Sequence, residues 1–111
     1  MLLIDEISKR ISEFENLCAS HNVKSLYAFG SSVTNRFDPD ISDIDLLVEI
    51  DVIDPIERGE KLISSWEKFE DFFQRKVDLL TGASIRNPYL RESIETTKVL
   101  IYDRSGKKVF I

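Results

Sequence analysis

The chain has 111 residues, of which 42% are hydrophobic and 32% are charged, and its formal net charge is −5. A chain of this size and composition forms one domain, 1–111, whose core is large enough to be stable without disulfide bonds or structural metals. Its net negative charge disfavours long nucleic acids as partners. No apolar run approaches the ~20 residues of a membrane span and no basic segment opens the chain, so we expect neither a membrane helix nor a signal peptide.

The first predicted element is an amphipathic helix over about residues 3–20, because apolar residues recur there at steps of three and four. His21 and Asn22 end it. The chain has one cysteine, Cys18, which cannot form an internal disulfide and therefore indicates a cytoplasmic protein. Cys18 is either a core residue or a reactive thiol beside His21, and its place on the apolar side of the helix favours the core.

Two predicted strands follow, at residues 23–29 and 44–50, with a loop-like segment at 35–42 between them. The first strand runs directly into a Gly-Ser-Ser turn. The second strand is almost continuously apolar, which is typical of a central strand covered on both faces.

The second half of the chain alternates helices and strands. A helix is predicted over 55–73, where the helical spacing of Trp66 and three phenylalanines favours core packing over a base-stacking surface. A strand at 76–81, a short helix from Asn87 with Leu90 and Ile94 inward, a strand at 99–102 and a returning strand at 109–111 complete the prediction. The order indicates an α/β (α+β) fold, with a mixed sheet of about four to five strands flanked by helices.

The acids at the start of the second strand are the clearest candidate site. Asp43 and Asp45 are two residues apart, so they lie on one face of the strand, roughly 7 Å apart. Neighbouring carboxylates favour a cation, and Mg²⁺ prefers such oxygen ligands. Asp78 in the next strand could join them, and three-carboxylate clusters hold two metal ions about 4 Å apart in phosphoryl transfer.

The turn at Gly30 and Ser31 is the second part of the candidate site. Glycine lets the backbone approach a ligand closely, and N–H groups at a strand-to-helix turn attract anions. The Ser31 hydroxyl adds a donor for a terminal phosphate, and Ser32 is a further candidate contact. Lys76 shares the predicted face of Asp78 and is either a phosphate contact or, more simply, a surface lysine.

Residues 23–102 resemble the minimal nucleotidyltransferases (MNT family) of the DNA polymerase β-like superfamily, on the segment FGSSVTNRFDPDISDIDLLVEI followed by KVDLLT. The resemblance implies the nucleotidyltransferase fold. It implies that Gly30 and Ser31 bind a triphosphate, that Asp43 and Asp45 bind Mg²⁺, and that Asp78 completes the metal site and helps to deprotonate the acceptor.

The segment departs from the family pattern in two ways. Eleven residues separate Ser31 from Asp43, one more than is usual, and we expect the extra residue to bulge near Asp38 and Pro39. Thr34 also stands where the family often has arginine. Arg36 is a candidate substitute as a nucleotide contact, or else a solvated surface residue.

The sequence favours a Mg²⁺-dependent nucleotidyltransferase that transfers AMP from ATP to a hydroxyl. The chain is short and acidic, so a protein acceptor is favoured over nucleic acid. The resemblance implies a HEPN-type (HEPT) toxin as that partner, modified on a tyrosine, with this chain as the antitoxin. The alternative is a module that binds nucleotide or partner without catalysis. Nucleobase specificity and homo- or hetero-oligomeric state are left open.

Overall fold

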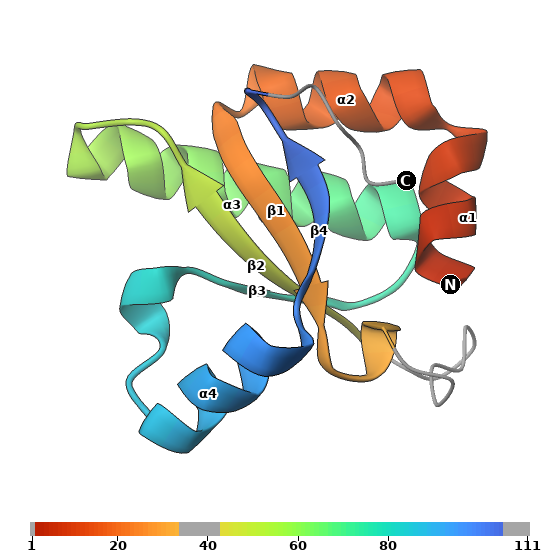
Figure 1. The fold of residues 1–111 in the computed structure, drawn as a ribbon. Helices are drawn as coiled ribbons and strands as arrows, with labels where there is room; N and C mark the ends of the chain where they lie inside the picture. The colour runs from red at the N-terminus through yellow and green to blue at the C-terminus, as the bar shows by residue number, and fades with distance from the viewer. Residues whose placement is uncertain (1, 34–42, 106–111) are drawn as a thin grey trace.

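The structure is a computed structural model that describes residues 2–33 and 43–105 (Figure 1). The described residues form helices and strands in an alternating order. In sequence these are α1 (Leu2–Lys9), α2 (Ile11–Ser20), β1 (Val23–Phe29), the 3₁₀ turn η1 (Gly30–Val33), β2 (Ile44–Ile50), α3 (Pro55–Phe73), β3 (Val77–Leu80), the 3₁₀ turn η2 (Gly82–Ser84), α4 (Pro88–Thr97) and β4 (Val99–Asp103).

The four strands form one mixed sheet in the order β3-β2-β1-β4. β1 lies between β2 and β4 and is antiparallel to both, whereas β2 and β3 are parallel. A parallel pair needs a crossover, and α3 provides it. This architecture confirms the predicted α+β fold class. The predicted return at 109–111 and the predicted loop at 35–42 lie outside the described residues.

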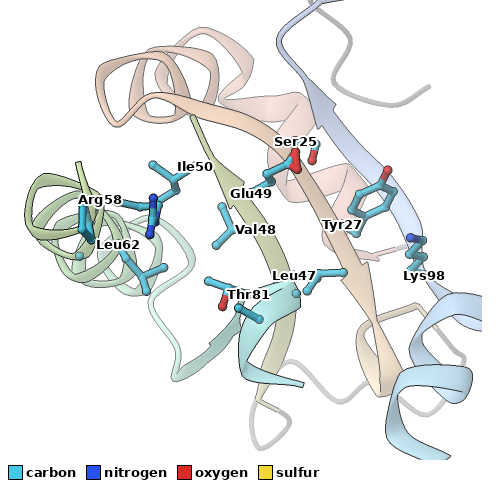
Figure 2. A pocket seen from close by; sticks show the side chains of 14 residues that line it. Ser25, Tyr27, Leu47, Val48, Glu49, Ile50, Arg58, Leu62, Thr81 and Lys98 are labelled. Atoms are coloured by element: carbon cyan, nitrogen blue, oxygen red, sulfur yellow. The ribbon is translucent and has the colours of Figure 1, made fainter. Parts of the chain in front are cut away.

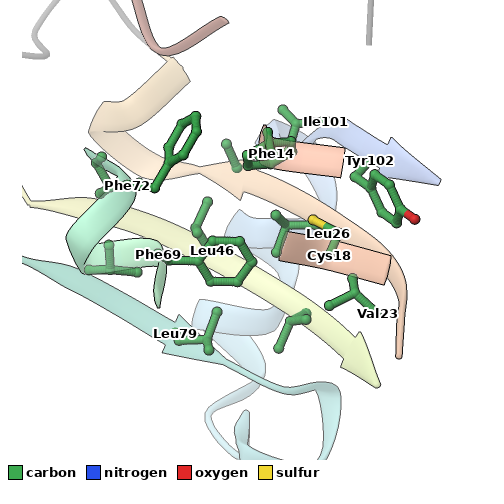
Figure 3. Packing of buried hydrophobic residues seen from close by; sticks show 14 of the residues in the cluster. Phe14, Cys18, Val23, Leu26, Leu46, Phe69, Phe72, Leu79, Ile101 and Tyr102 are labelled. Carbon is green, nitrogen blue, oxygen red and sulfur yellow. The ribbon is translucent and has the colours of Figure 1, made fainter. Parts of the chain in front are cut away.

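One face of the sheet carries the main core (Figure 3). Alternate strand residues such as Leu26 and Leu46 are fully buried beneath the helices α1, α2 and α3. Phe14 on α2 contacts the aromatic rings of α3, at centroid distances of 5.4 Å to Phe72 and 6.2 Å to Phe69. Cys18 is buried in the same cluster, which confirms its interpretation as a core residue.

The predicted single helix over 3–20 is wrong, because the chain breaks at Arg10 into α1 and α2 (Figure 1). Arg10 has φ −134° and ψ 44°, which is not helical. Its guanidinium donates to the Phe72 carbonyl at 2.8 Å and lies 4.2 Å from the Phe72 ring centroid. This contact ties the junction to the end of α3, so both short helices can turn apolar residues toward the core.

Helix α3 matches its predicted bounds because both ends carry strong local signals. Asp54 caps the N-terminus by accepting from the N–H groups of Ile56 and Glu57, and Pro55 occupies the first turn. Gln74 ends the helix in the left-handed conformation, with φ 54°.

The opposite face of the sheet is only partly covered, by α4 (Figure 1). A small cluster of Phe29, Ile85 and Ile94 packs there. The prediction that β2 is covered on both faces is therefore wrong for its C-terminal half, where Glu49 is exposed. Leu90, predicted to face inward, is 43% exposed, because only Ile94 of α4 reaches the sheet.

Candidate active site

Asp45 and Asp78 lie opposite each other in neighbouring parallel strands. Asp45 is on β2 and Asp78 on β3, and the sheet register pairs the two residues directly. Their strand neighbours Ile44 and Val77 turn into the core, so both carboxyl groups project from the partly covered face. The predicted approach of the two acids is thus produced by the register of one parallel pair.

The environment of Asp45 favours its uncharged form. The pKa of Asp45 is raised to about 6, first by its burial, then by the negative charges of Asp78 and Asp43, and by a hydrogen bond with Asp78. A hydrogen bond between two carboxyl groups requires a shared proton. Asp45 therefore keeps its proton to a higher pH than an ordinary aspartate does, and a bound cation would favour the charged form instead.

Gly30 brings the backbone of η1 against the Asp45 carboxylate. Its φ of +63° is the left-handed conformation that favours glycine, and it follows β1 directly. A Cβ atom at this position would lie 2.7 Å from Asp45 Oδ2. The sequence therefore needs glycine here both for the backbone angle and for the close approach of turn and acid.

Ser32 links the same turn to β2 through a buried hydrogen bond. The residue is 1% exposed, and its hydroxyl accepts from the Asp45 N–H at 2.9 Å. Its predicted contact with nucleotide stays a prediction, but the hydroxyl already has a role inside the protein. Ser31 lies between Gly30 and Ser32 and is partly exposed.

The donor set suits a hard divalent cation, because it consists of carboxylate oxygens whose mutual repulsion a cation would relieve. The structure brings together two of the three predicted acids. Asp43 precedes β2 and acts on Asp45 through its charge. Among residues 2–33 and 43–105, no three acid, histidine or cysteine side chains converge closely enough to hold one ion.

A cavity of about 440 Å³ opens beside the acid pair. Asp45, Asp78 and Gly30 line it together with apolar residues of α4 and the indole of Trp66. Trp66 is 39% exposed and its Nε1 donates to the Val77 carbonyl at 2.6 Å. The prediction of Trp66 as a core residue is therefore wrong, whereas Phe69, Phe72 and Phe73 are buried as predicted.

A larger hollow, of about 580 Å³, lies farther along β2 on the same face (Figure 2). Tyr27, Leu47, Glu49, Arg58 and Lys98 are among its lining residues, and none of the predicted acids or the Gly30 turn borders it. The Lys98 ammonium lies 4.5 Å from the centroid of the Tyr27 ring. The chemistry of the acids therefore belongs to the smaller cavity.

Two further predictions concern possible phosphate contacts. Lys76 is exposed, as expected of a surface lysine. Arg36 and the expected bulge at Asp38 and Pro39 lie outside the described residues.

Comparison with known families decides the class of the protein. The Nucleotidyltransferase domain matches residues 4–101. The chain belongs to this family. The predicted enzyme class, a nucleotidyltransferase, is confirmed by this match, and the turn and acids described above lie inside the matched range.

Two relatives within the family come from Methanocaldococcus jannaschii and are named as candidate protein adenylyltransferases. They are 38% and 37% identical to this chain over 101 residues. Each alignment covers 84% of this chain and 99% of the relative. The nucleotidyltransferase domain thus accounts for almost the whole of these relatives.

Solved structures share the nucleotidyltransferase fold. A candidate minimal nucleotidyltransferase is 23% identical, with a TM-score of 0.59 over 86% of this chain and 93% of that chain. A toxin–antitoxin structure with AMP-PNP is 23% identical, with a TM-score of 0.56 over 86% and 74%. A complex of the tri-AMPylated Shewanella oneidensis HEPN toxin with its MNT antitoxin is 21% identical, with a TM-score of 0.53 over 96% and 76%. At these identities the likeness establishes the fold.

No described helix of this nucleotidyltransferase domain combines the length and apolar character that crossing a bilayer requires.

Proposed function

We propose that this protein transfers AMP from ATP to a hydroxyl group of a partner protein. The observation that carries the proposal is the register pair Asp45–Asp78, with the pKa of Asp45 raised to about 6, facing a cavity beside the Gly30 turn. Family membership supports nucleotidyl transfer. The names of the M. jannaschii relatives support a protein acceptor.

In this proposal Asp45 and Asp78, with Asp43 beside them, hold Mg²⁺, and a second ion is expected in the same place. Bound Mg²⁺ would neutralise phosphate charge and make the α-phosphorus more open to attack. The backbone at Gly30 and the hydroxyl of Ser31 bind the triphosphate, and Arg36 is a further candidate contact.

The transfer exchanges one bond at phosphorus for another. The acceptor oxygen bonds to the α-phosphorus, and the bond from that phosphorus to the oxygen bridging to the β-phosphate breaks, so pyrophosphate leaves. Asp78 accepts the hydroxyl proton and passes it to solvent. The apolar wall formed by Trp66, Leu80 and Ile94 suits an acceptor whose hydroxyl is carried on an aromatic ring.

The partner in this proposal is a HEPN-type toxin, and the modified group is one of its tyrosines. The support is the similar fold of an MNT antitoxin in complex with an AMPylated HEPN toxin. This chain would then act as the antitoxin in a cytoplasmic pair.

The test is an intact-mass measurement on the product of the adjacent gene after incubation with this chain and Mg-ATP. We expect a gain of one or more AMP units, which Asp45→Asn abolishes. Glu49→Gln is the matched control, because it removes an exposed acid from the same strand and face and should leave the gain intact. Tight binding of the two proteins without any mass change would instead support the non-catalytic alternative.

A further inference from the structure

The outward side of α3 carries an apolar seam that nothing in the described chain covers. Ile56, Gly59, Ile63 and Trp66 follow one another at spacings of three, four and three residues, which places them along one side of the helix. Ile56 is 73% exposed, Ile63 60% and Trp66 39%. The outer side of a surface helix is normally polar, so an exposed stripe of this length indicates a contact surface.

A row of acids borders the seam. Glu60, Glu67 and Asp71 lie beside it at helical spacing and are exposed. None of the three forms an ion pair with another residue in the described ranges. Helix geometry places Lys68 on the side of this acid row that is farther from the seam.

The other basic residues of α3 are directed toward the body of the protein. Arg58 donates to the carbonyls of Val52 and Ile53, and Lys61 donates to the carbonyl of Ser20. The outer side of the helix therefore combines an exposed apolar surface with acids that form no ion pair within the described residues.

We propose that the seam and its acid row form the docking surface for a basic amphipathic helix of a partner protein. The seam has the spacing that a facing helix requires. Gly59 has no atom within 4 Å of a Cβ built on it, which leaves room for a partner side chain to approach the helix backbone. Lysine or arginine along the partner helix would meet Glu60 and Glu67.

Charge argues against two other occupants. A second copy of this chain has the same net charge of −5, and its own α3 surface would bring the same acidic row. An anionic lipid surface would be repelled for the same reason. A basic protein helix is the occupant that satisfies both the apolar and the charged part of the surface.

The seam leads to the acid cavity. Trp66 is its last member, and the same indole lines the cavity with Asp78 and is fixed to the Val77 carbonyl. A helix seated on the seam would therefore end at the rim of this cavity. Resting on the proposed function, the docked partner would present its acceptor hydroxyl there.

Binding at the seam can be measured by tryptophan fluorescence, because Trp66 is the one tryptophan of the chain. The probe is a synthetic helical peptide of about 18 residues, without aromatic residues, with leucines at the seam spacing and lysines beside them. A sister peptide carries glutamates in place of the lysines. We expect the lysine peptide to shift Trp66 emission to shorter wavelength in a saturable manner and the glutamate peptide to bind at least about tenfold more weakly.

Matched variants separate the apolar and charged contributions. The double substitution Ile56→Ser with Ile63→Ser should weaken binding of the lysine peptide at least about tenfold. The double substitution Glu60→Lys with Glu67→Lys should also weaken binding of the lysine peptide, and it should strengthen binding of the glutamate peptide. Tyr89→Ser changes an apolar residue of α4 that is 82% exposed, and it should leave both affinities within about twofold. Thermal unfolding checks that each variant is folded.

Three results would overturn the proposal: equal binding of the two peptides, unchanged binding by the serine double variant, or a wild-type dimer in sedimentation that the serine variant converts to monomer. Peptide binding requires no ATP and no acceptor chemistry. Failure of the AMP-transfer assay would thus leave this result standing, and loss of peptide binding with intact AMP transfer would reject only the docking surface.

Discussion

The two faces of the sheet differ in what their residues do. On one face, alternate residues such as Leu46 and Val77 are buried beneath α1, α2 and α3. On the other, Asp45 and Asp78 project toward a cavity that α4 only partly covers. Because side chains alternate along a strand, adjacent residues lie on opposite faces of the sheet. One of them stabilises the fold and the next is available for chemistry. Substitutions should therefore separate stability from activity according to face.

The largest separation of activity from stability should come from Asp45→Asn. Replacing the carboxylate removes a ligand and a negative charge from the site, and we expect the rate of AMP transfer to fall on the order of 10²–10³-fold. The folded structure should persist, because the amide can still hydrogen-bond to Asp78. Transfer rate and circular dichroism measured together would test this, and an unfolded variant would contradict the division between faces.

The opposite result is expected for Phe14→Ala. Phe14 is fully buried and contacts three phenylalanines of α3, so its loss leaves a cavity and lowers the free energy of unfolding by about 3–5 kcal/mol. Denaturant unfolding measures the change. Ile53→Ala, at a residue that is 94% exposed, is the control and should shift stability by less than about 0.5 kcal/mol.

Gly30→Ala should affect both stability and activity, because Gly30 has a left-handed backbone and lies close to the Asp45 carboxylate. The left-handed backbone costs about 1–2 kcal/mol for alanine, and the new Cβ would displace the Asp45 carboxylate. We expect lower stability and a transfer rate reduced at least about tenfold. Gly82→Ala is the matched control, since a Cβ there meets nothing within 4 Å. Equal effects of the two substitutions would show that the close approach at Gly30 is unimportant.

Substitutions of the adjacent residues Ser31 and Ser32 should distinguish binding of ATP from positioning of Asp45. Ser32→Ala leaves the Asp45 N–H without its buried partner, so we expect a loss of about 1–3 kcal/mol in stability and a lower kcat with little change in KM for ATP. Ser31→Ala should instead raise KM for ATP about tenfold. Steady-state kinetics beside thermal unfolding distinguish the two, and identical kinetic changes would refute the distinction.

The smallest effect should be the pH dependence of stability. The pKa of Asp45 is raised from 3.8 to about 6 in the folded protein, so the folded state keeps a proton that the unfolded state has lost. This contribution is complete below pH 3.8 and disappears as the pH rises through about 6. Asp45→Asn should therefore raise Tm by about 2–5 °C at pH 8 and by less at pH 5, without added Mg²⁺. Calorimetry at the two pH values tests the sign.

Local signals explain what the sequence could predict. Strands β1 and β2 are rich in apolar residues, which is the pattern that predicts buried strands. Asp54 and Pro55 mark the start of α3. The Gly30 turn and the acids on β2 and β3 are likewise visible because they sit at the ends of strongly patterned strands.

Long-range contacts explain what the sequence could not predict. The break at Arg10 depends on a carbonyl 62 positions away. The position of Trp66 at the cavity depends on a hydrogen bond to β3. The approach of Asp78 to Asp45 is predicted, but the exact register that pairs them forms only once α3 has crossed over. Neither the two carbonyl partners nor this register is identifiable from neighbouring residues in sequence.

The place of β4 at the edge of the sheet has a consequence for synthesis on the ribosome. β1 is made early, yet one of its two edges pairs with Val99–Asp103 at the far end of the described chain. Until that segment emerges, the nascent protein exposes an open strand edge, which is a template for pairing with other chains. Translation that stops before residue 99 should therefore yield aggregates, and a chaperone that shields β1 during synthesis should increase the yield of native protein.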